Sequence, residues 1–345
     1  MIRATLAQTN HFILRKNYLT AHKATTLTNL LGDLIGLPPS NPLFAAQLRL
    51  PQLASDELNK ALYKEATLME ATTMRNERYL IRVADYPNLY IATLRQRKQE
   101  FNAQFRLWGV ENEAIEQLGE QIMTRLADQP RTQTDLMAVL PNVQPLSQTS
   151  RGGRTTHTTN VALALAWLVA QGKLATRPQL DKTNPLYLPM SQAYPHLDLS
   201  QLPSEADAQC NLVRAYLAAF GPVNEADVSL WTGLSKSETA RAMGALTTET
   251  TLVLVEGLPG MLLLLKNQAE ALTTMPPFTQ DLNHLLPTND PYITAHRASR
   301  GRYFTNPKHY RQVFNSAGTA QPTILLNGQV IGTWDTSANT YLFID

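Results

Sequence analysis

The residues best suited to chemistry lie in two polar loops of an otherwise ordinary sequence. Ser40 and Asn41 lie in a proline-rich segment at 36–42, and Asp290 precedes a basic run. A hydroxyl, an amide or a carboxylate can orient a water molecule, and a carboxylate can also accept its proton. These three residues are therefore the candidate catalytic groups. Asp290 has a second interpretation, in which it pairs with an arginine at 297, 300 or 302 or caps a turn, and this role is the commoner one for such a residue.

Basic residues gather in three stretches, although the net charge of the chain is only +2. Residues 72–106 contain seven Lys or Arg against three Asp or Glu, and residues 147–182 and 289–311 each contain five against one. Residues 205–265, with three basic and seven acidic residues, have a net charge of −4. This distribution predicts one positive surface, built from several domains, that binds double-stranded DNA. The candidate DNA-binding residues are Arg75, Arg78, Arg151, Arg154, Thr155, His157, Arg297, Arg300 and Arg302.

The segment 147–159 is rich in Ser, Thr, Gly and Arg and is predicted to be a loop. Its centre reads Arg151-Gly152-Gly153-Arg154-Thr155-Thr156-His157. Glycines allow a backbone to approach a phosphate closely, and arginines and hydroxyls supply hydrogen-bond donors. The same composition also suits a flexible surface loop whose charge is incidental, and the sequence leaves both interpretations open.

Metal and redox chemistry have little support in the composition. The seven histidines lack ligand spacing, and the one cysteine, Cys210, cannot form a disulfide within the chain. We therefore predict no metal and no cofactor. No apolar run approaches the roughly 20 residues of a membrane span, and residues 1–10 do not resemble a signal peptide. We expect no membrane partner and a cytoplasmic, nucleoid-associated protein, whose oligomeric state the sequence does not predict.

The elements that position these residues are helices followed by short hairpins, and the stretch 207–266 contains one complete unit. Three helical patterns and two strand patterns succeed one another at 208–220, 224–231, 235–246, 251–255 and 261–265. Ser235 and Glu238 have the spacing of a capping box at the start of the third helix. Three helices and a hairpin in this order predict a winged helix.

A similar order recurs in the first two hundred residues. The predicted fold class is α+β, with three tandem winged-helix units followed by a small, barrel-like C-terminal β module. We assign the units to residues 1–110, 111–195 and 205–270, and the module to residues 278–345. Strands of the module are predicted at 292–295, 323–326, 330–334 and 340–344, and Asn327-Gly328 is the strongest hairpin signal in the chain.

Three ordered motifs resemble those of a known family, the AlkZ and YcaQ-like winged-helix DNA glycosylases. Gly221-Pro222-Val223, Asp227 and Trp231-Thr232-Gly233-Leu234 are similar to the family's G-P-x-T-x-x-D-x-x-x-W-T-G-L run; residues 285–292 resemble its L-L-P-x-F-D-P-Y; and residues 321–334 resemble its closing P-T-V-L-V-D-G-x-V-V-G-x-W hairpin. The resemblance implies a protein that removes bulky alkylated or crosslinked bases from DNA, with its pocket near residues 38–42.

The sequence departs from this family at one motif. The family carries Gln-x-Gln or Gln-x-Asp in a frame that Gly36, Leu37 and Pro42 match, but Pro38 and Ser40 occupy the two polar positions. Two hypotheses follow for a family member: a modified set of residues hydrolyses the glycosidic bond, or hydrolysis is lost and DNA binding is kept. From other classes, a non-enzymatic winged-helix DNA-binding regulator is the main alternative, and a scaffold for a protein partner is a third.

Overall fold

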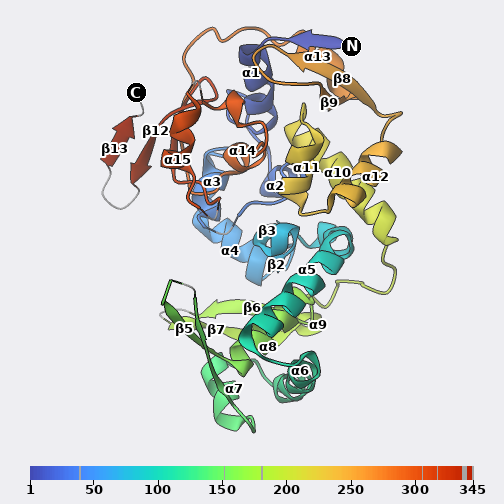
Figure 1. Ribbon diagram of the computed structural model, residues 1–345, viewed down its shortest axis with the longest axis vertical. Helices are drawn as coiled ribbons and strands as arrows, with labels where there is room; N and C mark the ends of the chain where they lie inside the picture. The colour runs from blue at the N-terminus through green and yellow to red at the C-terminus, as the bar shows by residue number, and fades with distance from the viewer. Residues whose placement is uncertain are drawn as a thin grey trace. The chain divides into compact units, whose positions relative to one another are not determined.

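Helices alternate with short hairpins along the chain, which gives a mixed α+β structure (Figure 1). The computed structural model describes residues 1–345 apart from 39, 151, 180–181, 305, 317, 336–339 and 344–345. The chain divides into two units, one made of Met1–Met69, Tyr79–Ala92 and Pro203–Asp345, and the other of Glu70–Arg78 and Thr93–Leu202. Within the described part of the chain, each helix is too short or too polar to span a lipid bilayer.

The first unit begins with short helices that side chains cap. Thr5 and Gln8 form a capping box at the start of the first helix, Thr26 caps the second, and Asn41 caps the third. The elements in order are β1 (Ile2–Ala4), α1 (Leu6–Lys16), α2 (Leu27–Asp33), α3 (Pro42–Gln47) and α4 (Ser55–Tyr63). The hairpin strands β2 (Leu68–Thr72) and β3 (Arg78–Arg82) and the helix α5 (Tyr86–Trp108) follow, and each contributes residues to both units. The segment 38–42, which carries the candidate catalytic residues, therefore leads directly into α3.

The three helices and hairpin predicted at 207–266 are present. They are α10 (Glu205–Phe220), α11 (Glu225–Thr232), α12 (Lys236–Ala245), β8 (Thr250–Val255) and β9 (Leu262–Leu265), followed by α13 (Ala269–Thr273). The capping box of Ser235 and Glu238 is formed at the start of α12. The hairpin is not isolated, because β1 pairs in parallel with β8 and aligns Ile2 with Val253 (Figure 1). The first residues of the chain thus complete a sheet that begins 250 residues later.

The C-terminal segment forms a four-stranded antiparallel sheet. Its strands lie in the order β10 (Asn283–Leu286), β11 (Thr323–Leu326), β12 (Gln329–Asp335) and β13 (Thr340–Phe343). Asn327 and Gly328 both have positive φ and join β11 to β12, so this predicted hairpin is confirmed. Among the described residues β10 and β13 are unpaired edges, so the predicted barrel is not closed.

The prediction of a strand at 292–295 is wrong, since residues 292–294 belong to the short helix α14 (Pro291–Thr294). Asp290 caps this helix by accepting a hydrogen bond from the Tyr292 amide, and Pro291 occupies its first position. A proline with an Asp cap before it starts a helix, and this local signal outweighs the β propensity of Tyr292 and Ile293. The rest of the loop before β11 contains the 3₁₀ turns η4 (Arg300–Arg302) and η5 (Pro307–His309) and the helix α15 (Tyr310–Val313).

One hydrophobic core joins the two ends of the chain within the first unit. Phe12 of α1 packs in the same cluster as Val253 of β8, Tyr292 of α14 and Leu325 of β11. The C-terminal segment is therefore held against the N-terminal helix by apolar burial, the main favourable contribution to folding. The loop that carries Asp290 is consequently anchored to α1.

The second unit has a separate core, formed around α6 and α8, and contains a hairpin that the sequence did not predict. Its elements are α6 (Asn112–Leu126), α7 (Gln133–Val139), β4 (Pro145–Thr149), β5 (Thr155–Thr159), α8 (Asn160–Ala170), β6 (Leu174–Gln179), β7 (Lys182–Pro189) and α9 (Met190–Ala193). The predicted loop at 147–159 is mostly the β4–β5 hairpin, in which Ser147 lies opposite His157. Because both strands are largely exposed, they lack the alternation of apolar and polar residues that marks a half-buried strand.

Candidate functional site

The loop before α3 carries one exposed hydroxyl that is held in place by the C-terminal segment. Ser40 Oγ donates a hydrogen bond to the Thr288 carbonyl at 2.9 Å. Asn41 Oδ1 accepts a hydrogen bond from the Phe44 amide at 3.3 Å, which caps α3. Pro38 offers no polar side-chain atom. Besides these contacts, Ser40 Oγ keeps lone pairs, and Asn41 Oδ1 keeps one, that can accept a hydrogen bond from a water molecule.

A cavity of about 650 Å³ is lined in part by Thr288, the residue to which Ser40 is hydrogen-bonded, and we call it the cavity beside Ser40. Its lining residues are Thr288, Gln312, Gln321, Pro322, Thr333, Trp334, Asp335, Tyr341 and Leu342. Trp334 Nε1 donates to the Leu286 carbonyl at 2.9 Å, and the Trp334 ring centroid lies 5.8 Å from that of Phe44 in α3. The lining therefore combines amide, hydroxyl and carboxylate groups with the aromatic rings of Trp334 and Tyr341.

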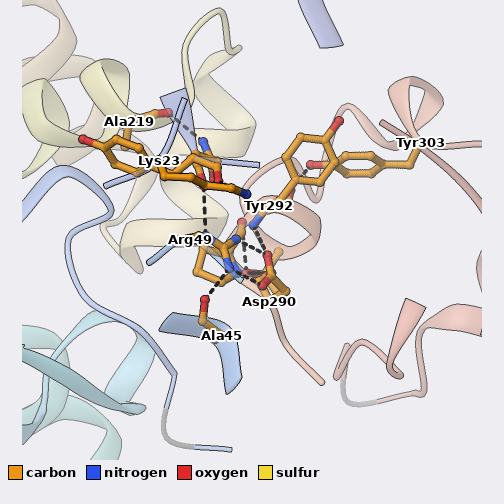
Figure 2. A network of polar contacts seen from close by, with 11 residues as sticks. Lys23, Ala45, Arg49, Ala219, Asp290, Tyr292 and Tyr303 are labelled. Atoms are coloured by element: carbon orange, nitrogen blue, oxygen red, sulfur yellow. Dashed lines mark hydrogen bonds and ion pairs between the residues drawn. The ribbon is translucent and has the colours of Figure 1, made fainter. Parts of the chain in front are cut away.

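Asp290 lies in the interior, away from solvent, and forms a paired contact with Arg49. Its two carboxylate oxygens accept hydrogen bonds from Arg49 Nη2 at 2.7 Å and Nη1 at 2.9 Å, and neither side chain is exposed (Figure 2). The Tyr292 amide donates a third hydrogen bond at 2.9 Å. Asp290 thus has both structural roles that the sequence left open, but its arginine is 241 residues away and is none of the three expected partners. A carboxylate without an exposed atom cannot take a proton from a water molecule at the surface.

Arg49 is satisfied on every side, which explains how two charges can be buried together. Besides the carboxylate, its guanidinium donates to the Asn17 carbonyl at 3.0 Å and to the Ala45 carbonyl at 2.9 Å (Figure 2). Arg49 therefore ties α1, α3 and the loop before α14 together. No sequence signal identified it, because two of its three partners, Asn17 and Asp290, lie 32 and 241 residues away.

A second carboxylate of the sequence motifs also holds a loop. Asp227, in α11, is fully buried and accepts hydrogen bonds from the backbone amides of Ala298 and Ser299 at 2.7 and 3.0 Å and from the Ser299 hydroxyl at 2.5 Å. This contact anchors the loop that leads to η4. Asp227 and Asp290 thus each hold a segment of backbone in place, and neither carboxylate is exposed to solvent.

The predicted DNA-binding arginines of the first unit differ in exposure. Arg297 Nη2 donates to the Gly318 carbonyl at 2.8 Å, and the Arg300 guanidinium lies 3.6 Å from the centroid of the Tyr310 ring. Arg302 is fully buried and donates to the Pro222 carbonyl at 3.1 Å. A buried guanidinium offers no surface to a phosphate, so the prediction that Arg302 binds DNA is wrong. The core around Tyr292 and Tyr303 encloses this side chain.

The predicted DNA-binding residues of the second unit lie near its surface. Arg75 pairs with Glu77 at 2.6 Å, and Arg78 pairs with Glu70 and also donates to Thr176 at 3.0 Å. Arg154, Thr155 and His157 are exposed on or next to β5. Arg151 lies outside the described residues. The common positive surface that would join these residues to those of the first unit stays a prediction.

Metal coordination has no site in the part of the chain that the structure describes: no group of three or more His, Cys, Asp or Glu is placed to hold an ion. The buried histidine has a different partner set. The Nε2 and Nδ1 atoms of His296 lie 2.8 Å from the Phe220 carbonyl and 2.7 Å from the Tyr303 hydroxyl. The imidazole therefore belongs to the interior hydrogen bonds of the first unit.

His296 is expected to make the protein less stable in mild acid. Burial first, and then the charge of Arg302, lowers the pKa of His296 well below its usual value of 6.5. Below pH 6.5 the unfolded chain binds a proton that the folded chain excludes. The stability contributed by the neutral imidazole is therefore complete above pH 6.5 and is lost as the pH falls, by at most about 1.4 kcal/mol per pH unit.

Urea unfolding of the wild type and of His296→Gln over this pH range tests this prediction. The variant is expected to lose stability less steeply as the pH falls from 6.5. His22→Gln, which removes an exposed imidazole, serves as the matched control and should keep the slope of the wild type. An equal slope for His296→Gln and the wild type would contradict the prediction.

Comparisons with known proteins agree with the three sequence motifs. The family described as DNA glycosylase AlkZ-like matches residues 27–342. An interstrand DNA cross-link repair glycosylase of Streptomyces sahachiroi is 24% identical, over 97% of this chain and 88% of that protein. The solved structure of S. sahachiroi DNA glycosylase AlkZ is similar with a TM-score of 0.79 and 20% identity, over 100% of this chain and 92% of that one, which shows a common fold. The resemblance is confirmed, and this chain belongs to the AlkZ-like DNA glycosylase family.

Proposed function

We propose that this protein binds double-stranded DNA at a bulky alkylated or crosslinked base and releases bases that carry a positive charge. The observation that carries the proposal is the 2.9 Å hydrogen bond from the Ser40 hydroxyl to the carbonyl of Thr288, a residue that lines the cavity. The S. sahachiroi relative is named for repair of interstrand cross-links, which supports a bulky lesion as the substrate. In this proposal the protein acts on chromosomal DNA in the cytoplasm, associated with the nucleoid.

The architecture behind this proposal is three winged-helix units and a C-terminal β module, with the boundaries 1–110, 111–195, 205–270 and 278–345. The helices α10, α11 and α12, followed by the β8–β9 hairpin, support a winged helix at residues 205–270. In the winged helix proposed at residues 111–195, the helices α6, α7 and α8 precede the β6–β7 hairpin, and the β4–β5 hairpin is inserted before α8. Winged helices place a helix or a hairpin against DNA, so Arg154, Thr155 and His157 on the exposed β4–β5 hairpin are proposed phosphate contacts.

The chemistry must proceed with little help from acidic or basic side chains. The bond between C1′ of the deoxyribose and the base nitrogen breaks, and its electrons leave with the base, whose positive charge they neutralise. Water adds its oxygen to C1′ and loses a proton to solvent. Ser40 can orient this water by accepting a hydrogen bond, while Asp290 is kept from it by Arg49. The cationic base, as a good leaving group, therefore accounts for most of the reaction rate, and the protein contributes by positioning the water and the sugar.

The cavity beside Ser40 suits the base of such a lesion. Its volume of about 650 Å³ falls within the range of about 300–1,000 Å³ usual for ligand sites. Tyr341 and Leu342, which line it, are 49% and 65% exposed, so their apolar surfaces are available to a planar group. Stacking of a base on an aromatic side chain contributes about 1–3 kcal/mol. A base with a bulky adduct need not leave the helix fully to reach this surface.

A base-release assay with purified protein tests the function. Duplex DNA with an N7-alkylated guanine, which is cationic, is expected to lose that base, whereas duplex with a neutral ethenoadenine is expected to keep it. Ser40→Ala removes one hydrogen bond to water and should slow the release about fivefold, the equivalent of about 1 kcal/mol. Asn59→Ala, an exposed change in the same unit, serves as the control and should leave the rate unchanged.

Two outcomes would contradict the proposal in different ways. If the protein binds the damaged duplex but releases no base, the chain is a non-enzymatic DNA-binding protein, the alternative that Pro38 and Ser40 favour because neither is a general base. If it also fails to bind duplex DNA at low salt, the DNA assignment itself is wrong. Binding and release are therefore measured on the same preparation.

A further inference from the structure

A second cavity, of about 600 Å³, lies around α15 in the C-terminal segment, and its lining is basic and aromatic. The residues that define it are Arg297, Arg300, Tyr310, Arg311, Phe314 and Gly318. None of the lining residues is acidic. Three guanidinium groups thus line one hollow, and their combined positive charge favours an anionic ligand. We refer to this cavity as the arginine pocket.

Arg300 is held in the arginine pocket by aromatic rings. Its guanidinium carbon lies 3.6 Å from the centroid of the Tyr310 ring and 5.5 Å from that of Phe314, and these two rings stack at 4.7 Å. Stacking of this kind fixes the plane of the guanidinium and leaves its edge available for hydrogen bonds. Arg300 Nε is buried and has no hydrogen-bond partner among the described residues. The side chain is therefore oriented but not satisfied.

Arg297 is fixed by a glycine on the opposite side of the arginine pocket. Its Nη2 donates to the Gly318 carbonyl at 2.8 Å, and Gly318 has a φ of +80°. A Cβ atom at position 318 would lie 1.6 Å from Nη2, so any other residue there would displace the guanidinium. Arg311, on α15, is exposed and completes the set. Two arginines are thus positioned before any ligand arrives.

The shape and charge of the arginine pocket identify its ligand as a phosphate group. Guanidinium forks match the oxygens of phosphate and bind them through paired, charge-assisted hydrogen bonds. The position of the pocket points to the DNA backbone as the source. Arg311 of the pocket is followed by Gln312, which lines the cavity beside Ser40, so both cavities are lined by residues of α15.

Resting on the proposed function, we infer that the arginine pocket binds a backbone phosphate next to the damaged nucleotide and so sets the register of the strand over the cavity beside Ser40. Phosphate contacts position a protein on DNA without reading its sequence. Register matters here because the cavity accepts one base, and a shift by one nucleotide would present a different one. Arg302, buried beneath the neighbouring loop, takes no part in this contact.

Salt-dependent binding of damaged duplex by variants tests the inference. Arg311→Gln is expected to weaken binding about tenfold and to lower the slope of log affinity against log salt by about 1, the change for one lost phosphate contact. Lys308→Gln removes the same charge three residues away, outside the lining of the pocket, and is the matched control. It should change affinity less than about twofold. Arg300→Lys keeps the charge and should weaken binding with an unchanged slope, because the planar fork is lost.

The outcomes separate the possible sources of phosphate. Equal effects of Arg311→Gln and Lys308→Gln on duplex binding would overturn the inference. Tight binding of inorganic phosphate that Arg311→Gln abolishes, with duplex binding unchanged, would also overturn it and mark a site for a free anion. Failure of the wild type to bind duplex DNA would refute the proposed function. In that case, unchanged NMR signals of the pocket arginines on addition of inorganic phosphate would show that the arginine pocket does not bind phosphate either.

Discussion

The double substitution Pro38→Gln and Ser40→Gln is expected to raise the rate of release of N7-alkylguanine about 100-fold, the lower end of the usual effect of one well-positioned hydrogen-bonding side chain. Glutamine supplies both a carbonyl acceptor and an amide donor on a side chain longer than that of serine. At positions 38 and 40 it would create the Gln-x-Gln motif of the family in a frame that Gly36, Leu37 and Pro42 already match. The base-release assay on duplex DNA measures the gain.

The control for this experiment is Pro38→Ala with Ser40→Ala, which removes the same proline ring without adding polar atoms. It should bind damaged duplex like the wild type and release base no faster than Ser40→Ala. If the glutamine variant binds the duplex normally but shows no gain in rate, the loop at 38–42 does not lie at the reacting sugar. The cavity beside Ser40 would then lose its proposed role.

Breaking the buried pair of Arg49 and Asp290 is expected to have the largest effect on stability. Arg49→Met leaves the Asp290 carboxylate without its two hydrogen bonds of 2.7 and 2.9 Å in a position that water does not reach. An unpaired buried charge costs about 3–5 kcal/mol. Urea unfolding at neutral pH, monitored by circular dichroism, should therefore show a large fall in the midpoint for Arg49→Met and for Asp290→Asn.

Two further variants show whether the cost comes from the unpaired charge. Arg49→Met combined with Asp290→Leu removes both charges and should recover part of the stability, since replacing a whole buried pair by apolar residues is often neutral. Arg214→Met breaks the exposed pair with Glu249 and should have a much smaller effect, because water solvates the carboxylate that remains. If Asp290→Asn is as stable as the wild type but releases no base, Asp290 is catalytic and its structural role here is wrong.

Local signals in the sequence located most elements but failed where two signals competed. The capping box of Ser235 and Glu238 and the Asn327-Gly328 turn act within a few residues, and the structure contains both. The residues 292–295 carry β-prone side chains behind an Asp-Pro start, and the helix start prevails in α14. The β4–β5 hairpin was missed because its threonines are exposed on both faces, so no apolar alternation marks it.

The candidate site was only partly predictable for a related reason. Ser40 and the segment at 38–42 were identified from the family frame, and the structure adds the hydrogen bond to Thr288 that fixes the hydroxyl. Arg49 and Arg311 were not identified. The role of Arg49 depends on Asp290, which is 241 residues away. Arg311 ends the basic stretch at 289–311, but only the fold places it beside Arg297 and Arg300 in the arginine pocket.

The sequence by itself determined the helix caps, the hairpin turns, the mixed α+β composition and, through three motifs, the family. These follow from interactions between residues close in the chain, or from motifs that can be read in order. Only the tertiary structure decided that β1 pairs with β8, that Asp290 is buried against Arg49, and that Arg302 lies inside while Arg311 lies at the surface. The physical reason is that burial and charge pairing depend on which distant segments share a core, and here one core contains residues of both the N-terminal helix and the C-terminal sheet.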